Sequence, residues 1–436
     1  MSSRANRKRR SRGPSLTEHL DLKPGDRITL RLGPLNDAGD ATAHLDGAPV
    51  EVAGGLPGED VIAEVIRAFP ERVAAKVALA VSPSPDRVAP PCPYYLQCTG
   101  CQLQHMQYES QLEFKRGRLA AELAKWPALA GATVLPTLAS PRQLGYRNHA
   151  RFSVGKGNDV ASGTGRGDVG YVNAVTRRLV RVDRCLLMDD RVNAALAAMQ
   201  GRLAGMSQLS VRVGSAVEDG AQAGTESEHP FGSYLIQPEL VSPDVPFPSG
   251  QTHYQEEALG RRFRVAGSSF FQVNTQQLEN VVGLLKDRLG LTGAETVVDA
   301  YCGVGTFAVL LAPYARRVIG IEDSVTAVED ARANAKGLLN VEFVSGRSED
   351  AMGRIEGGVD AVVLDPPRAG CHPGAIEAVK RLRPAQVALV SCEPSAMARD
   401  LDGLLKGPFS LASVQPVDMF PQTRHVEAVA FLRLSS

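Results

Sequence analysis

The sequence predicts an α/β protein in which two β-rich parts precede a C-terminal domain built on a parallel sheet. Three observations predict this fold. Short alternating strands, punctuated by Gly and Pro, occupy residues 24–82; a Pro-rich boundary follows at 82–93; and strands alternate with helices from about residue 270. The chain has 436 residues, of which 44% are hydrophobic, so it has the material for two or three domains with separate cores.

Charge is balanced over the whole chain but not along it. Lys+Arg and Asp+Glu both number 48, and this zero net charge alone argues against a nucleic-acid partner. The first 12 residues, however, hold six basic residues and no acidic one. We interpret residues 1–20 as a disordered basic arm that either touches nucleic acid or only keeps the chain soluble. With no signal peptide and no apolar run of membrane-spanning length, we expect a soluble, cytoplasmic protein.

The strands after the arm fit a small OB-type barrel over residues 21–84, a fold that often binds oligonucleotides. The alternative is a barrel with a purely structural role. Residues 105–125 are predicted to be helical and to pack on the C-terminal domain, because Leu112, Leu119 and Leu123 recur at helical spacing. This helix belongs to a β-rich central domain that we place at residues 90–265.

Apolar strands separated by helical segments predict a parallel sheet with crossover helices in residues 266–436. The strands are expected at Thr296–Ala300, Val318–Glu322, Val341–Val344, Ala361–Leu364 and Gln386–Ser391. In open sheets of this kind, ligands bind at the carboxyl ends of the strands. The polar residues that follow these strands are therefore the candidate site residues.

The first strand runs into a Gly-rich turn. Gly303 and Gly305 let the backbone approach a ligand closely, and the helix that follows offers free N–H groups. Glu322 ends the next strand, where an acid can accept hydrogen bonds from ribose hydroxyls. Residues 303–308 also match a dinucleotide-binding pattern, so a nicotinamide-dependent dehydrogenase is the competing interpretation.

Two features favour a methyltransferase over a dehydrogenase. Asp299 and Tyr301 precede the glycines in an Asp-x-Tyr-x-Gly-x-Gly arrangement, and an Asp-Pro-Pro-Arg loop begins at Asp365. At these places the sequence resembles S-adenosylmethionine-dependent methyltransferases. In that class the first loop holds the methionine part of the cofactor, and the Asp-Pro-Pro loop lies beside the methyl group.

Two further places suit covalent chemistry. Cys392 directly follows an apolar strand, so it is expected at the same sheet edge as Asp365; a lone Cys is otherwise a small buried hydrophobe. As a nucleophile it would act as thiolate, helped by positive groups. His425 and Glu427 are expected on one face of a strand, where Glu427 can serve as a general base and His425 can position a neighbour. Judged alone, both would be solvated strand residues.

Together these motifs resemble the S-adenosylmethionine-dependent RNA (uracil-5-)-methyltransferases. The Asp-Pro-Pro-Arg-x-Gly, Ser-Cys-x-Pro and His-x-Glu elements follow in that family's order, and Ser-Phe-Phe-Gln-Val-Asn at residues 269–274 opens its catalytic domain. The resemblance covers nearly the whole chain. It implies a Rossmann-like methyltransferase domain, an N-terminal OB-type barrel called TRAM, and a β-rich central iron–sulfur domain.

The resemblance also assigns residue roles. Cys392 would add to C6 of uracil so that C5 can accept the methyl group, and Glu427 would then remove the C5 proton. Five residues would line the cofactor site: Gln272, Tyr301, Thr306, Glu322 and Asp365. The target base must be single-stranded or flipped out, because its reacting carbons lie inside the base stack. An adenine amino-methyltransferase is disfavoured, since Arg368 stands where that class prefers an aromatic residue.

Seven cysteines in a long chain without a signal peptide make a poor disulfide framework. Cys92, Cys98 and Cys101 supply three thiolates within ten residues, and this spacing leaves zinc and an iron–sulfur cluster both open, with Cys185 or His105 as the fourth ligand. The family resemblance implies a structural [4Fe–4S] cluster held by the four cysteines.

RNA is the expected partner. Arg147, His149 and Arg151 share one predicted strand face, and a second basic run spans residues 177–184. With the arm and the barrel, these predict contact with RNA phosphates. The cysteine spacing and the barrel resemble the branch that forms 5-methyluridine in 23S ribosomal RNA. The alternatives are a transfer RNA enzyme and a noncatalytic RNA-binding iron–sulfur protein, which would need neither Cys392 nor Glu427.

Overall fold

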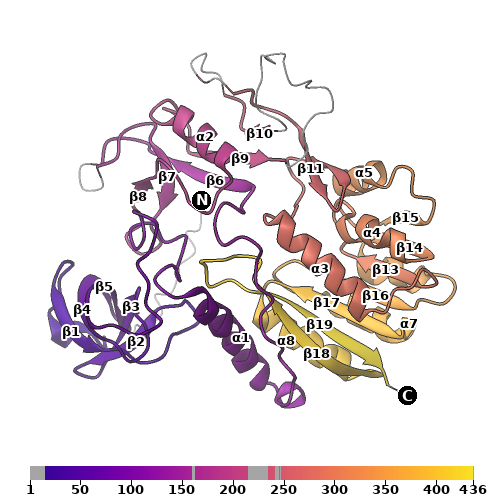
Figure 1. Ribbon diagram of the computed structural model, residues 1–436, viewed down its shortest axis with the longest axis horizontal. Helices are drawn as coiled ribbons and strands as arrows, with labels where there is room; N and C mark the ends of the chain where they lie inside the picture. Colours follow the sequence, from indigo (N-terminus) through magenta and orange to yellow (C-terminus); the bar gives the residue numbers. More distant parts are fainter. Residues whose placement is uncertain (1–14, 160–162, 215–233, 241–244, 246, 436) are drawn as a thin grey trace, which may run out of the picture. The chain divides into compact units, whose positions relative to one another are not determined.

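The computed structural model describes residues 15–159, 163–214, 234–240, 245 and 247–435 (Figure 1). The basic residues of the predicted arm, which end at Arg12, lie outside the described residues. The chain divides into two compact units: an N-terminal unit of Met1–Gln107 with Val172–Arg178, and a C-terminal unit of Tyr108–Tyr171 with Leu179–Ser436. Among the described helices, none has both the length and the apolar character needed to cross a membrane.

The N-terminal unit is built on one five-stranded sheet. Its strands are β1 (Arg27–Arg31), β2 (Ala41–Leu45), β3 (Ala48–Ala53), β4 (Asp60–Phe69) and β5 (Arg72–Ser82), in the spatial order β1-β4-β5-β3-β2. Alternate residues of β4 are buried, as in Val61, Ala63 and Val65. This period of two is what a sheet with one covered face requires.

The predicted closure of this sheet into a barrel is not found. In the described part of the unit, the edge strands β1 and β2 do not pair as a ladder. Just beyond β1, the Gly33 N–H donates to the Thr42 carbonyl (2.7 Å) and the Thr42 N–H donates to the Pro34 carbonyl (3.0 Å). Pro34 has no N–H with which to extend that pairing. The five strands therefore form an open sheet whose edges meet over a short stretch.

The first part of the C-terminal unit is helix α1 (Tyr108–Ala124) followed by a second five-stranded sheet. This sheet has the order β10-β9-β6-β7-β8, and helix α2 (Asp190–Met199) packs against β9. Its strands are β6 (His149–Val154), β7 (Val169–Val172), β8 (Leu179–Arg181), β9 (Gln208–Val213) and β10 (Tyr234–Gln237). A hairpin of β11 (His253–Ala258) and β12 (Arg261–Ala266) leads into the catalytic fold.

A seven-stranded sheet forms the rest of the unit, in the order β15-β14-β13-β16-β17-β19-β18. The parallel strands are β13 (Thr296–Ala300), β14 (Arg317–Glu322), β15 (Val341–Ser345), β16 (Ala361–Leu364) and β17 (Gln386–Ser391). The antiparallel pair β18 (Phe409–Val417) and β19 (Glu427–Leu434) completes it. The strand order reverses between β13 and β16, and such a switch point is where open α/β sheets bind ligands.

Helices cover both faces of this sheet (Figure 1). They are α3 (Thr275–Arg288), α4 (Thr306–Leu311), α5 (Val325–Asn334), α6 (Ser348–Ala351), α7 (Pro373–Leu382) and α8 (Pro394–Leu405). Val297 packs in the cluster under α3, α4 and α5, while its neighbour Val298 packs in the cluster under α7 and α8. Leu119 and Leu123 of α1 join this second cluster, so α1 packs on the catalytic sheet.

Candidate active site

The Gly-rich turn after β13 has a backbone that requires glycine. Gly305 begins α4 with φ +81°, in the left-handed region, and a Cβ at this position would come within 3.0 Å of the Phe343 ring. Tyr301 also has positive φ, at 65°. Asp299, fully buried at the end of β13, accepts a hydrogen bond from the Ala308 N–H of α4 (2.8 Å). The acid therefore ties the helix to the strand and shapes the turn between them.

Glu322 joins this turn to the end of β14. Its carboxylate accepts hydrogen bonds from the backbone N–H groups of Gly303 (3.0 Å), Asp323 (3.0 Å) and Ser324 (2.8 Å). Glu322 also lines the adjacent cavity. Each carboxylate oxygen can accept more than one hydrogen bond, so Glu322 can hold the turn and still accept from a ribose hydroxyl.

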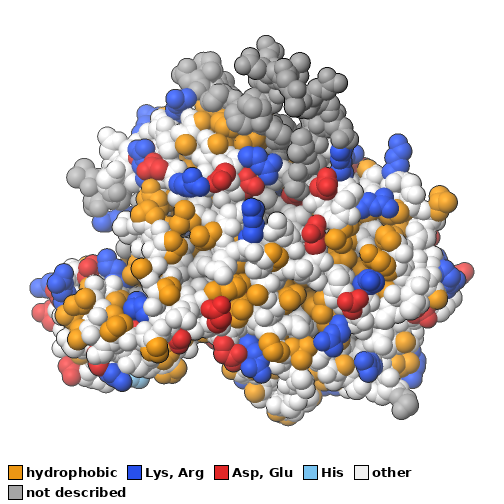
Figure 2. All heavy atoms as spheres, in the orientation of Figure 1, with side chains coloured by type: hydrophobic (Ala, Val, Ile, Leu, Met, Phe, Trp, Pro, Cys, Tyr) orange, Lys and Arg blue, Asp and Glu red, His pale blue; other side chains and the backbone are white. Residues whose placement is uncertain are grey.

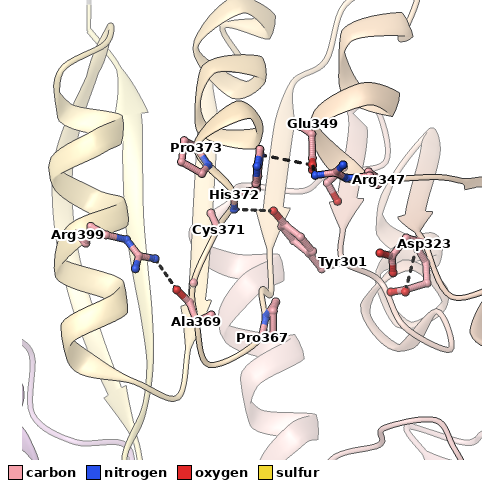
Figure 3. A pocket seen from close by; sticks show the side chains of 13 residues that line it. Tyr301, Asp323, Arg347, Glu349, Pro367, Ala369, Cys371, His372, Pro373 and Arg399 are labelled. Atoms are coloured by element: carbon pink, nitrogen blue, oxygen red, sulfur yellow. Dashed lines mark hydrogen bonds and ion pairs between the residues drawn. The ribbon is translucent and has the colours of Figure 1, made fainter. Parts of the chain in front are cut away.

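A cavity of about 530 Å³ opens at the carboxyl ends of the strands (Figure 3). It is lined by Tyr301, Glu322, Asp323, Arg347, Ser348, Glu349, Pro367, Ala369, Gly370, Cys371, His372, Pro373 and Arg399. The Tyr301 hydroxyl accepts a hydrogen bond from the His372 N–H (3.2 Å), and the His372 ring lies 3.4 Å from the Glu349 carboxylate. Glu322 connects the Gly-rich turn to this cavity, because it lines the cavity and accepts from the Gly303 N–H.

Of the five residues predicted for the cofactor site, Tyr301 and Glu322 line this cavity, whereas Gln272, Thr306 and Asp365 do not. Gln272 is buried, with its backbone carbonyl accepting from the Asn148 side chain (3.3 Å). Thr306 is the first residue of α4, and Asp365 follows β16 directly. Thr306 and Asp365 thus lie after the carboxyl ends of β13 and β16, whereas Gln272 lies between β12 and α3.

Sequence reasoning missed the lining residues contributed by two loops. Arg347–Glu349 follow β15, and Ala369–Pro373 follow the Asp-Pro-Pro loop. Their position after parallel strands was the available signal, but neither segment carries a motif that would have singled it out.

Cys392 and Glu427 are brought together by strand pairing. β17 and β19 are antiparallel, with Ser391 opposite Ala428. Cys392 follows Ser391 and Glu427 precedes Ala428, so the two residues lie beside each other. Cys392 is half-buried, and burial, with the charge of Glu427, raises the pKa of its thiol to about 11. Arg368 opposes this shift through its charge and a hydrogen bond.

Glu427 is a buried carboxyl, 5% exposed, at the first position of β19. Burial and the charge of Asp365 raise its pKa well above the usual range, and Arg368 again opposes the shift. Burial also raises the pKa of Asp365 to about 7. Cys392, Glu427, Asp365 and Arg368 therefore form one electrostatic group. The contribution of Arg368 was not predicted from the sequence, where it served only to separate methyltransferase classes.

His425 lies before the strand and not on it, because β19 begins at Glu427. Its backbone N–H donates to the Thr423 hydroxyl (3.3 Å). Burial, with the nearby positive charges of Arg424 and Arg368, lowers the pKa of His425 to about 4. The ring is therefore neutral at physiological pH, so it cannot supply positive charge to the site.

The predicted metal ligands are not gathered by the structure. Within the residues it describes, no group of three or more His, Cys, Asp or Glu side chains has an arrangement that could hold a metal ion. Cys92, Cys98 and Cys101 belong to the N-terminal unit and Cys185 to the C-terminal unit, all four half-buried. The arrangement of the described side chains therefore gives no support to the predicted [4Fe–4S] cluster.

His105 is equally unsuited to zinc. Its Nδ1 is 2.5 Å from the Tyr95 hydroxyl and its Nε2 is 3.1 Å from the Gly55 carbonyl. Both ring nitrogens are engaged, and burial lowers the pKa of the ring to about 4. His105 is a buried structural histidine.

The predicted basic surfaces carry less positive charge than their composition suggests. Arg181 is paired with Asp168 (3.3 Å) and Asp183 (3.1 Å), and Arg184 is paired with Asp190 (2.8 Å). Figure 2 likewise shows Lys and Arg side chains interspersed with Asp and Glu over the visible face.

A hollow of about 640 Å³ lies on the sheet of β6, β9 and β10. His149, Arg151 and Arg212 contribute to its lining, together with Gln208 and Ser210. The pKa of His149 is lowered to about 3 by burial and by the neighbouring arginines, so this residue stays neutral. The alternation of β6 is as predicted, with Ala150 and Phe152 buried behind this face.

Comparison with known proteins identifies the family. The family model for tRNA (Uracil-5-)-methyltransferase matches residues 256–435. An uncharacterized RNA methyltransferase of Gloeobacter violaceus is 34% identical, with 95% of this chain and 98% of that protein covered. One from Listeria monocytogenes is 31% identical over 95% of this chain and 99% of its own length.

A solved structure agrees with the sequence relatives. The Pyrococcus abyssi tRNA (uracil-54, C5)-methyltransferase in complex with S-adenosyl-L-homocysteine superposes with a TM-score of 0.67 at 25% identity, covering 93% of this chain and 100% of that one. These matches confirm the predicted methyltransferase fold and exclude the dehydrogenase interpretation. The chain therefore belongs to a family of RNA methyltransferases that use S-adenosylmethionine, and its C-terminal region matches the tRNA (Uracil-5-)-methyltransferase model.

Proposed function

We propose that the protein methylates C5 of a uridine in RNA through a covalent adduct with Cys392. The observation that carries the proposal is the pairing of β17 with β19, which sets a cysteine beside a buried glutamate at the sheet edge that also holds Asp365 and the cofactor cavity. A nucleophile and a base at one ligand-binding edge is the arrangement that covalent catalysis needs. The family model and the uracil-specific Pyrococcus abyssi enzyme support it.

The proposed steps follow from uracil chemistry. The Cys392 thiolate adds to C6, forming a C–S bond and moving the ring electrons onto C5 and its carbonyl as an enolate. C5 then takes the methyl group from the sulfonium, and S-adenosylhomocysteine leaves. Glu427 removes the proton from C5, the C5=C6 bond re-forms and the C–S bond breaks, which frees the enzyme.

The electrostatics of the site suit both residues. Arg368 favours the thiolate of Cys392 against the effect of burial, which is the help that a cysteine nucleophile requires. A carboxylate with a raised pKa, such as Glu427, is a stronger base than an exposed one. This suits removal of a proton from carbon.

For the cofactor, we propose that Glu322 accepts from the ribose hydroxyls and that Tyr301 lies against the nucleoside in the cavity. Thr306 and Asp365 would contact the methionine part, since they follow the Gly-rich turn and β16, and the family resemblance adds Gln272 to the cofactor site. Asp365 would also reach the pyrimidine, because its charge acts on both Cys392 and Glu427.

We propose ribosomal RNA as the substrate. The support is the resemblance of the cysteine spacing and the N-terminal β unit to the 23S branch. Transfer RNA is the second candidate, favoured by the description of the matching family model and by the substrate of the Pyrococcus abyssi neighbour.

A labelled-methyl assay tests the proposal. Purified protein is incubated with labelled S-adenosylmethionine and either unmodified 23S ribosomal RNA or transfer RNA, and the product nucleoside is mapped. We expect 5-methyluridine in one of the two RNAs. An absence of label at uridine C5 in both would contradict the proposal.

Two substitutions test the residue roles. Cys392→Ala should form no covalent complex with RNA, because no nucleophile remains. Glu427→Gln should accumulate the methylated covalent complex, visible as a shifted band on a denaturing gel, because the C5 proton stays in place. Glu377→Gln, at an exposed carboxylate on α7, is the matched control and should behave as wild type. A complex that persists without Cys392 would refute the assigned nucleophile.

The [4Fe–4S] cluster stays a prediction from the resemblance, without support from the placement of its cysteines. Anaerobic purification followed by iron, sulfide and zinc analysis decides it. A brown protein that contains iron and acid-labile sulfide would establish the cluster. A colourless protein free of iron would contradict the prediction of a cluster.

A further inference from the structure

Helix α1 is joined to the segment Asp418–Val426, which connects β18 to β19, by a set of buried polar contacts. Lys115 and Asp418 are both 0% exposed, and the Lys115 ammonium donates to Asp418 Oδ1 (2.5 Å) and to the Phe420 carbonyl (3.0 Å). The Tyr108 hydroxyl donates to the second carboxylate oxygen of Asp418 (2.8 Å). Each residue of this buried ion pair therefore has a hydrogen-bond partner in addition to the other residue.

Further along α1, Gln111 and Arg118 bind the same segment. The Gln111 side chain accepts from the Gln422 N–H (3.1 Å) and donates to the Gln422 side-chain oxygen (3.0 Å). Arg118 donates to the Arg424 carbonyl (2.9 Å). The four α1 residues that bind the segment are three, four and three positions apart, so they share one face of the helix.

Two other elements hold the segment from elsewhere. The Tyr146 hydroxyl donates to the Pro421 carbonyl (3.1 Å), and the Asn274 side chain donates to the Met419 carbonyl (3.3 Å). The carbonyls of residues 419, 420, 421 and 424 are therefore all hydrogen-bonded to side chains outside the segment.

Stability alone does not account for this arrangement. Removing a lysine and an aspartate from water carries a large desolvation penalty, and replacing such a buried pair by apolar residues is often neutral or stabilising. Apolar packing of α1 on the sheet is already provided by Leu119 and Leu123. The polar contacts instead fix the path of one segment of backbone.

That segment ends at the proposed base. Val417 pairs with Glu427 at the end of the β18–β19 ladder. Asp418 is therefore the residue directly after the pairing partner of Glu427. The path of the backbone at Asp418 therefore bears on the position of Glu427, which stands beside Cys392.

We propose that Lys115, together with Gln111, is a positioning residue that fixes the segment Asp418–Val426 and so holds Glu427 in line with the C5 proton of the uracil adduct. This inference rests on the proposed function. It assigns to α1, which lies outside the matched family model, a part in the proton-removal step.

The test is the double variant Lys115→Met with Asp418→Asn, which removes both charges, keeps similar volumes and leaves no lone buried charge. We expect a folded protein with an unchanged KM for S-adenosylmethionine and a kcat lower by ~10- to 100-fold, since small misplacements of a catalytic group have effects of that size. Because proton removal is the impaired step, the methylated covalent RNA complex should accumulate during turnover. A merely structural contact would change neither kcat per folded molecule nor this complex.

The control is Lys125→Met, which removes an exposed lysine just beyond α1 that pairs with Glu122. It should match wild type in kcat and in complex formation. Gln111→Met is a second test that removes the two hydrogen bonds to Gln422 without touching the ion pair, and it should shift both readouts in the same direction as the double variant.

The inference is overturned if wild type methylates uridine while both Lys115→Met/Asp418→Asn and Gln111→Met keep its kcat and accumulate no complex. A lower Tm with normal kcat in the folded fraction would overturn it as well. If wild type itself forms no covalent complex and transfers no methyl group, the proposed function fails instead, so the two failures are distinct.

Discussion

At the scale of single residues, Arg368 has a central part in setting the charge state of the proposed nucleophile and base. It is the cation that opposes the raised pKa of both Cys392 and Glu427. Lys115 acts at a distance through backbone, and His425 is neutral. Burial raises the pKa of Cys392 and Glu427, and the Arg368 guanidinium lowers it. These two opposing effects therefore set the fraction of each residue that is deprotonated and reactive.

The rate of methylation should rise with pH up to about pH 11, the raised pKa of the Cys392 thiol. Cys392 and Glu427 both act deprotonated, and the pKa of each is raised, so a higher pH increases the reactive fraction. Arg368→Gln removes the opposing cation and should move the whole profile to higher pH. Single-turnover rates measured across this range check both statements. A profile that falls with pH, or one that Arg368→Gln leaves in place, would contradict this view of the site.

Glu322→Gln should weaken S-adenosylmethionine binding by about tenfold or more, because hydrogen bonds to a charged group contribute roughly 1.5–3 kcal/mol. The same substitution weakens the hydrogen bond that the Glu322 side chain accepts from the Gly303 N–H. Calorimetric titration of the cofactor measures the effect. Glu329→Gln, at an exposed position of α5, is the control and should bind as wild type does.

At the scale of elements, local pattern was sufficient for the parallel sheet. The predicted bounds of β13, β16 and β17 agree with the structure because each is a buried apolar run that ends at a polar turn. Barrel closure in the N-terminal unit could not be predicted, because it depends on whether two edge strands meet. Alternation within a strand does not specify its partner.

In the candidate site, too, some residues could be predicted from local sequence pattern and others could not. The positions of four residues could be predicted, since each follows a strand end or belongs to a motif, and their roles stay predictions: Cys392, Glu427, Glu322 and Tyr301. The roles of Lys115 and Gln111 could not, because a lysine and a glutamine in a helix are ordinarily solvent-facing. Their partners are 303 and 311 residues away in the chain.

Gly305→Ala should lower stability more than Gly290→Ala does. Both glycines have positive φ (+81° and +62°), so both substitutions introduce backbone strain of roughly 1–2 kcal/mol. At Gly305 the new Cβ also meets the Phe343 ring at 3.0 Å, whereas at Gly290 nothing lies within 4 Å. Denaturant unfolding of the two variants measures the difference. Equal losses would show that the turn can shift away from Phe343.

At the scale of the whole molecule, the zero net charge describes the surface better than its basic runs do. The run at 177–184 is partly neutralised by Asp168, Asp183 and Asp190. Among the basic elements found in the sequence, residues 1–12 have the largest excess of positive charge, with six basic residues and no acidic one. Electrostatic attraction to RNA is therefore expected to come in large part from the first 12 residues.

Deleting residues 1–12 should flatten the salt dependence of RNA binding without abolishing methyl transfer. Each lost phosphate contact changes the slope of log K against log salt by ~0.7 for a single strand. Fluorescence anisotropy over a range of salt concentrations measures the slope. Arg181→Gln is the comparison, because this arginine is already paired with two carboxylates and should leave the slope nearly as it is. An unchanged slope after deletion would show that the arm does not contact RNA.

The contact between Lys115 and Asp418 also has a consequence for how the protein is made. At roughly 5–20 residues per second of synthesis, the 303 residues between them take about 15–60 seconds. During that interval the newly made α1 has no partner for its lysine, which stays hydrated until the final strands leave the ribosome. Among the described strands, β18 and β19 are made last, and they flank Asp418 and carry the proposed base. A nascent chain therefore becomes competent for methyl transfer only after β19 has been made, and a chain that terminates before β19 is inactive rather than weakly active.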